Sequence, residues 1–300
     1  MINIAIADTY ISLATGREAA LRERMAVNYG PFLTDTLPDE ILMRVDCDRT
    51  IDIGTTPPAK TFRYEIGPDK ATLRIYPHER YLLSIENSPS GRCFSIECPA
   101  VNGESDTYEC YSDLAAQNVA PPQHILDHLL IFALSIAGLH KKILLIHAST
   151  ITYAGQTIMF LGESGTGKST HTRMWLETIA GARLLNDDAP ALRIFDNGKI
   201  KAYGTPWSGK TPCYLNESYP LAALTRIKRA PYNRMTRCAT LKSFGAVLPS
   251  CLPTLQQCDE TLDALCDTLS DLLSTVPVYT LECLPNHDAA HTAKSALFGE

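Results

Sequence analysis

Residues 157–169 read TIMFLGESGTGKS, and Gly162 to Ser169 form a complete G-x-x-x-x-G-K-[ST] pattern within them. The apolar run at 157–161 predicts a strand that enters the glycine-rich segment, and residues 170–179 predict a helix that leaves it. Glycines let a loop turn its backbone N–H groups onto phosphate oxygens, and a helix N-terminus adds a positive dipole. The stretch therefore predicts an α/β fold organised around a nucleotide phosphate site.

Each residue of this loop is a candidate for nucleotide binding. Lys168 is long enough to reach the β- and γ-phosphates, and the hydroxyl of Ser169 can ligate Mg²⁺. We expect ATP and Mg²⁺ as cofactors, while the choice between ATP and GTP stays open. The cofactor-binding residues predicted on this basis are Gly162, Glu163, Ser164, Gly165, Thr166, Gly167, Lys168, Ser169 and Thr170.

Asp187 and Asp188 are the second signal. They follow an apolar strand predicted at 183–185, which should neighbour the strand before the loop. Phosphoryl transfer needs a carboxylate near Mg²⁺ and often a second one that accepts the proton of the attacking hydroxyl. Both are therefore candidate catalytic and metal-binding residues, together with Lys168 for catalysis and Ser169 for the metal. The alternative is an Asx turn that closes the strand, and which Asp does which job stays open.

Two other segments carry polar groups that suit either structure or chemistry. His147 follows an apolar strand predicted at 143–146, where a histidine is usually packed or hydrogen-bonded. The segment GTPWSGK at 204–210 offers Trp207 and Lys210 as parts of a substrate or phosphate loop. The same composition also suits an ordinary surface turn.

The composition excludes several classes of protein. Three hundred residues permit one large or two ordinary domains, and a net charge of -6 gives no drive toward nucleic acid or anionic membranes. Ten cysteines occur without a C-x-x-C pair, so we expect reduced thiols. The start lacks a secretory pattern, and the apolar run at 129–139 is too short to span a bilayer. We expect a cytoplasmic protein with neither nucleic-acid nor membrane partners; a basic cluster at 226–237 is interpreted as a solvated face, and a homo-oligomer stays open.

The chain changes character near residue 120. Residues 1–120 are predicted to be a β-rich region of unknown role, and 121–300 to be a catalytic nucleotide-binding domain. Strands are predicted at 62–66, 71–76, 81–86, 92–97, 105–111, 143–146, 151–153, 157–161, 183–185, 191–195, 199–203, 223–228 and 276–281. Helices are predicted at 123–139, 170–179, 241–248 and 259–273.

Four segments together resemble one family. IHAST at 146–150, GESGTGKST at 162–170, NDD at 186–188 and GTPWSGK at 204–210 are similar to the HPr kinase/phosphorylase-like catalytic domain, which is related in its nucleotide site to ATP-dependent phosphoenolpyruvate carboxykinase. The resemblance covers about residues 125–285. It implies a mixed, strongly curved sheet with flanking helices. It also implies that His147 stands near the phosphates and the acidic pair, as a further candidate catalytic residue, and that the paired Asp residues serve Mg²⁺ and base functions.

The resemblance implies a Mg²⁺/ATP-dependent kinase that transfers the γ-phosphate to a Ser-like hydroxyl of a protein, peptide or small metabolite. Two alternatives stay open: a non-catalytic ATP-binding accessory protein, and a lyase of the phosphoenolpyruvate carboxykinase kind. The chain departs from HPr kinases at Thr170, where those enzymes usually carry Glu, and throughout residues 1–120. The acceptor and any phosphorylase activity therefore stay open.

Overall fold

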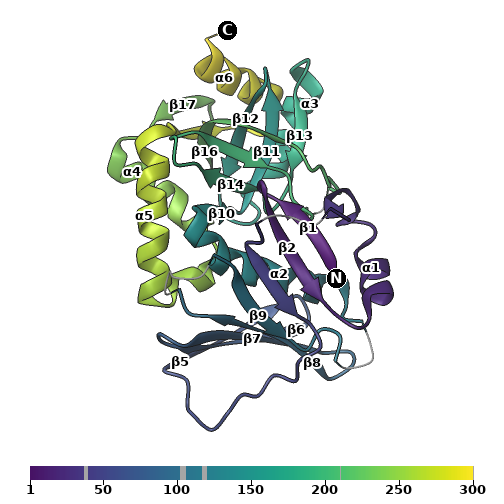
Figure 1. Ribbon diagram of the computed structural model, residues 1–300. Helices are drawn as coiled ribbons and strands as arrows, with labels where there is room; N and C mark the ends of the chain where they lie inside the picture. Colours follow the sequence, from purple (N-terminus) through teal and green to yellow (C-terminus); the bar gives the residue numbers. More distant parts are fainter. Residues whose placement is uncertain (37–39, 102–105, 117–119, 210, 300) are drawn as a thin grey trace. The chain divides into compact units, whose positions relative to one another are not determined.

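The computed structural model describes residues 1–300 except 37–39, 102–105, 117–119, 210 and 300. Within the described residues, the chain is a mixed α/β protein with six α-helices and two nine-stranded sheets (Figure 1). It divides into two compact units, residues 1–140 with 254–262 and residues 141–253 with 263–300. Each unit contains one of the sheets.

The first unit is built on a mixed sheet with the strand order β3-β1-β2-β4-β9-β8-β7-β6-β5. Its pairings are antiparallel except for those of β4 with β2 and with β9. The strands are β1 (Ile2–Ile6), β2 (Thr9–Ala14), β3 (Leu33–Thr34), β4 (Met43–Asp46), β5 (Lys60–Ile66), β6 (Asp69–Tyr76), β7 (Arg80–Asn87), β8 (Arg92–Pro99) and β9 (Tyr108–Ser112). Helix α1 (Glu18–Met25) follows the first hairpin, and α2 (Gln123–Ala137) packs on β7 and β8.

The second unit holds the glycine-rich loop in a sheet with the order β10-β14-β15-β16-β12-β11-β13. Strand β16 also pairs with β18, which pairs with β17. The pairings of β16 with β12 and with β18 are parallel, so this sheet is mixed too. The strands are β10 (Ile143–Leu145), β11 (Ala148–Tyr153), β12 (Gln156–Leu161), β13 (Arg183–Asn186), β14 (Ala191–Ile194), β15 (Ile200–Tyr203), β16 (Ser218–Arg229), β17 (Arg234–Arg237) and β18 (Val278–Cys283).

Four helices and four short 3-10 turns complete the chain. The helices are α3 (Lys168–Thr178), α4 (Thr240–Val247), α5 (Asp259–Thr275) and α6 (His287–Phe298). The 3-10 turns are η1 (Gly30–Phe32), η2 (Gly138–Lys141), η3 (Leu248–Ser250) and η4 (Pro253–Gln256). Among the described residues, no helix has both the length and the apolarity that crossing a bilayer requires.

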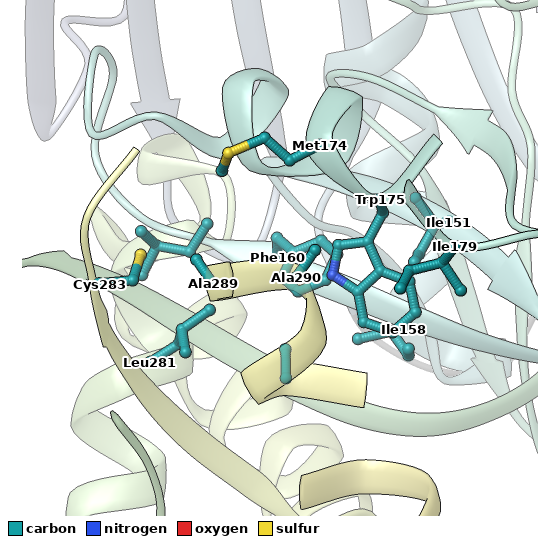
Figure 2. Close-up of a cluster of buried hydrophobic side chains, with 12 residues drawn as sticks. Ile151, Ile158, Phe160, Met174, Trp175, Ile179, Leu281, Cys283, Ala289 and Ala290 are labelled. Carbon is teal, nitrogen blue, oxygen red and sulfur yellow. The ribbon is translucent and has the colours of Figure 1, made fainter. Parts of the chain in front are cut away.

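The core of the second unit fixes the helix that follows the loop. Trp175 of α3 is fully buried against Phe160 of β12, with 6.1 Å between ring centroids, and the alanines of α6 pack beside them (Figure 2). Burying a large aromatic side chain contributes about 3 kcal/mol. Because α3 and β12 are held on this core, the loop between them has two fixed ends.

The predicted elements are confirmed with shifts of a few residues, and several observed elements were not predicted. The predicted neighbour of the strand at 183–185 is wrong: β13 pairs with β11, because β11 and β16 occupy the two sides of β12, the strand before the loop. The predicted α/β class with a mixed sheet is confirmed, whereas its assignment to the HPr-kinase-like fold stays a prediction. The helix predicted at 123–139 is confirmed as α2, which ends at Ala137, and the apolar run within it is buried, with Leu129 and Leu130 fully so. Contacts group α2 with the first unit, and a domain division at residue 120 stays a prediction. The elements missed by sequence are β1, β2, α1, β3, β4, β17 and α6.

Candidate nucleotide site

The glycine-rich loop leaves β12 and enters α3 with a backbone that only glycine adopts easily. Gly162, Gly165 and Gly167 have φ values of 153°, 78° and 108°. A Cβ on Gly162 would lie 2.6 Å from Thr166 Oγ1, and that hydroxyl donates to Glu163 O at 2.8 Å. Positive φ is costly for other residues, so the three glycines are required by the shape of the loop.

Lys168, the first residue of α3, folds back over the loop that precedes it. Its ammonium donates to Gly162 O at 2.9 Å and to Glu163 O at 3.3 Å, and Lys168 as a whole is only 9% exposed. Burial lowers the pKa of Lys168, and the nearby carboxylates of Asp188 and Asp187 partly oppose that effect. The Lys168 ammonium is therefore held at the loop by backbone carbonyls and by the nearby carboxylates.

His147 links Lys168 to the acidic pair. Its Nε2 lies 2.8 Å from Lys168 Nζ, and its Nδ1 lies 3.2 Å from Asp188 Oδ1. Because the lysine ammonium can only donate, Nε2 accepts and the proton of a neutral ring lies on Nδ1, facing the carboxylate. The structure thus brings together the three residues Lys168, His147 and Asp188. Both His147 and Asp188 are about half exposed, at 46% and 45%.

Asp187 differs from Asp188 in its surroundings. It is only 7% exposed, and its Oδ1 is buried with no hydrogen-bond partner among the described residues. Carboxylate oxygens buried in proteins are normally paired with a donor or a cation. The two acidic residues are therefore not equivalent, a distinction that sequence left open.

Asn186, the first residue of the NDD segment but not a predicted site residue, fixes the backbone of the acidic pair. Its Oδ1 accepts from the N–H groups of Asp188 and Ala189, both at 3.0 Å. Its Nδ2 donates to Thr205 Oγ1 and to Trp207 O, each at 3.1 Å. The fully buried Asn186 thus ties the end of β13 to the loop that begins at residue 204.

The loop at 204–209 packs directly against the acidic pair. A Cβ on Gly204 would lie 1.9 Å from Leu215 O, and one on Gly209 would lie 2.9 Å from Asp187 O. Both glycines are therefore needed for close backbone approach. Trp207 is only 3% exposed. Its role in a substrate or phosphate loop stays a prediction. Lys210, the other candidate in this loop, lies outside the described residues.

Two arginines of β16 reach the glycine-rich loop, while the rest of the basic cluster is exposed, as expected of a solvated face. Arg226 is level with Leu161 in the parallel pairing of β16 and β12, and its guanidinium lies 3.5 Å from Glu163 Oε1. Arg229 donates to Gly165 O. The register of β16 with β12 brings these arginines to the loop. The sequence showed the basic cluster but could not show that it lies beside the loop.

The remaining loop residues lie on the surface beside these groups. Glu163, Ser164, Gly165 and Ser169 are exposed, while Thr166 and Thr170 are partly exposed. Among the described residues, no group of three or more His, Cys, Asp or Glu side chains is arranged to hold a metal ion by itself. A bound Mg²⁺ commonly keeps only one or two carboxylates and takes its other ligands from water and phosphates.

No family model matches the chain, and no curated protein matches it. Among solved structures, an Hpr(Ser) kinase/phosphatase from Coxiella burnetii is 11% identical, with 52% of this chain and 93% of that chain covered and a TM-score of 0.29. A likeness this low does not assign the chain to a family.

Proposed function

We propose that the chain is a Mg²⁺/ATP-dependent kinase that transfers the γ-phosphate to a hydroxyl group of a protein, peptide or small metabolite. The observation that carries this proposal is the connected set of Lys168, His147 and Asp188 at the glycine-rich loop. Phosphoryl transfer is catalysed mainly by positioning and by electrostatic stabilisation, and this set supplies a cation, a bridging imidazole and a carboxylate.

Lys168 binds the phosphates in this proposal. Its contacts with Gly162 O and Glu163 O hold the ammonium in place. Phosphate oxygens are stronger acceptors for an ammonium than neutral carbonyls, because the hydrogen bond is then charge-assisted at both ends. Arg226 and Arg229, which already contact the loop, add positive charge on its other side.

Asp188 is the proposed base. Its carboxylate is half exposed, so an acceptor hydroxyl can reach it, and it faces the Nδ1 side of His147. A hydrogen bond from that ring orients the carboxylate toward the loop. His147 is then a positioning residue that fixes Asp188 relative to the Lys168 ammonium.

The residues fit a Mg²⁺ ion. Asp187 offers a buried carboxylate oxygen without a partner among the described residues, and Ser169 offers an exposed hydroxyl at the start of α3. Hard oxygen donors of this kind suit Mg²⁺. When bound, the ion neutralises charge on the β- and γ-phosphates. We propose that Asp187 and Ser169 hold it.

The test is transfer of label from [γ-³²P]ATP into a cell extract, with the labelled acceptor then identified. We expect labelling by the wild type and none by Lys168→Ala. Lys199→Ala is the matched control, because Lys199 is exposed in the turn between β14 and β15. ATP binding without transfer to any acceptor would instead support the accessory protein, and ATP-dependent conversion of oxaloacetate to phosphoenolpyruvate would support the lyase.

A further inference from the structure

A cavity of about 560 Å³ opens beside the glycine-rich loop within the second unit. One wall is the loop end and the first turns of α3, including Thr170, His171 and Met174. The other walls are the end of β16, residues 227–230, and the turn after β18 at residues 283–285. Its volume lies within the range of small-molecule sites.

The cavity and the Lys168 ammonium lie on different sides of the loop strand. His147 precedes β11 and Asp188 follows β13, so the groups around the ammonium belong to the β11–β13 side of β12. The cavity walls from β16 and β18 belong to the opposite side of β12. In a loop of this pattern the lysine reaches the β- and γ-phosphates while the backbone cradles the α- and β-phosphates. A nucleotide with its γ-phosphate at Lys168 therefore points its other end toward the cavity.

The cavity walls combine one positive charge with apolar side chains. Among the described residues that line it, Arg229 is the one charged residue, and its guanidinium donates to the loop carbonyl of Gly165. The walls also carry apolar side chains, including Met174, Ile227 and Leu284. Positive charge beside apolar walls suits a ligand with a charged phosphate end and a flat, uncharged base.

His171 keeps its part of the wall uncharged. It is 1% exposed, and its Nε2 accepts a hydrogen bond at 3.0 Å from Trp175 Nε1. Because indole N–H only donates, the proton of the neutral ring lies on Nδ1. Burial lowers the pKa of His171 to about 3, so the ring is neutral near pH 7. This wall therefore adds no positive charge that would attract a second phosphate.

We propose that this cavity binds the ribose and base of the nucleotide and does not select guanine. The inference rests on the proposed function, since it assumes that phosphates occupy the loop. A carboxylate can accept from the N1–H and N2–H₂ donors of guanine at the same time, and none of the described residues that line the cavity has a carboxylate or carboxamide side chain. ATP should therefore bind at least as tightly as GTP.

The experiment measures the affinities of Mg·ATP, Mg·GTP and inorganic tripolyphosphate by titration calorimetry. Ala230→Trp places an indole in the cavity, and Ala180→Trp, at an exposed position after α3, is the matched control. We expect Ala230→Trp to weaken ATP at least tenfold and to leave tripolyphosphate within twofold. Ala180→Trp should change neither affinity. An equal effect of Ala230→Trp on both ligands, no effect on ATP, or a tenfold preference for GTP would overturn the inference.

Lys168→Ala separates this inference from the proposed function. If Lys168→Ala weakens ATP while Ala230→Trp does not, the phosphate site stands and the cavity assignment falls. If the wild type binds neither ATP nor tripolyphosphate, both fall. A measurement on the unaltered protein decides the matter if Ala230→Trp does not fold. Photolysis with 8-azido-ATP should label residues 227–230 or 283–285, and labelling only outside the cavity walls would contradict the assignment.

Discussion

Replacing Asn186 by alanine tests how the acidic pair is held in place. Asn186 is fully buried, and its side chain accepts from two backbone N–H groups and donates to partners on residues 205 and 207. Asn186→Ala removes all of these hydrogen bonds and leaves the partner groups in the protein interior. The backbone of Asp187 and Asp188 then loses the interactions that connect it to the neighbouring loop.

The cost can be worked from those bonds. The amide has two N–H donors and two accepted hydrogen bonds, and each typically contributes about 1 kcal/mol net. Part of this free energy is recovered in the variant, because Asp188 and Ala189 are partly exposed to water and because Ala189 N also contacts Trp207 O at 3.4 Å. We expect Asn186→Ala to lower the free energy of unfolding by about 2–4 kcal/mol. Asn186→Asp should cost at least as much, because a carboxylate oxygen would then face the carbonyl of Trp207.

Urea unfolding and calorimetric binding of Mg·ATP make the measurement. Asn197→Ala is the control, because Asn197 is an exposed turn residue whose Oδ1 accepts from Lys199 N at 3.0 Å. The control should cost less than about 1 kcal/mol. The reasoning is refuted if Asn186→Ala unfolds within about 0.5 kcal/mol of the wild type. It is refuted equally if stability falls while nucleotide affinity and transfer are unchanged, since Asn186 would then not position the acidic pair.

Three further predictions concern Gly204, His147 and His171. Gly204→Ala should lower the free energy of unfolding by about 3 kcal/mol or more in urea, because its Cβ would meet Leu215 O at 1.9 Å, whereas Gly245→Ala, with open space in α4, should stabilise by about 0.5–1 kcal/mol. His147→Phe should slow γ-phosphate transfer about tenfold or more at saturating Mg·ATP with little change in ATP affinity; unchanged transfer would exclude His147 as a positioning residue. The pKa of His171 in the folded protein, about 3, lies below its ordinary value of 6.5, so the folded protein resists protonation of this ring. The stability that the neutral ring contributes is therefore complete above pH 6.5 and is lost by about 1.4 kcal/mol per pH unit as the pH falls toward 3. Urea midpoints of the wild type and His171→Gln should therefore converge as the pH falls, and a constant difference would contradict this.

The sequence predicted the strand, loop and helix around Lys168 because their signals are local. An apolar run, glycines at fixed spacing and a polar-apolar helical segment are each readable from a few residues. The first hairpin, β1 and β2, was missed because its turn lacks such a local signal. Its turn uses Ala7 and Asp8 at φ 56° and 54°, without the Asn-Gly or Asp-Gly pair that normally marks such a turn.

One missed element did carry local signals. Helix α6 has an N-cap at Asn286, whose side chain accepts from Ala289 N, and it ends at Gly299 with φ 73°. An asparagine cap and a glycine at opposite ends of an apolar-periodic segment are recognised helix boundaries. This helix was therefore accessible to sequence reasoning.

The resemblance implied that His147 stands near the phosphates, but the side chains that it contacts could not be read from the sequence itself. His147 contacts Lys168 and Asp188 because β11 and β13 lie side by side, and Arg226 reaches the loop through the register of β16 with β12. Such pairings join residues far apart in the chain, so they depend on the topology of the sheet. The difference between Asp187 and Asp188 is likewise a difference of burial that adjacent identical residues cannot reveal.

The most direct test of the account is the Mg²⁺ dependence of ATP binding by the wild type and by Asp187→Asn, measured by titration calorimetry with Mg²⁺ or with EDTA. Asp196→Asn, at an exposed position in the turn between β14 and β15, is the control. We predict that the wild type and the control bind ATP at least tenfold more tightly with Mg²⁺, and that Asp187→Asn loses most of that difference. Equal affinity of the wild type in Mg²⁺ and EDTA, or full Mg²⁺ dependence in Asp187→Asn, would contradict a metal–nucleotide site at the glycine-rich loop and the acidic pair.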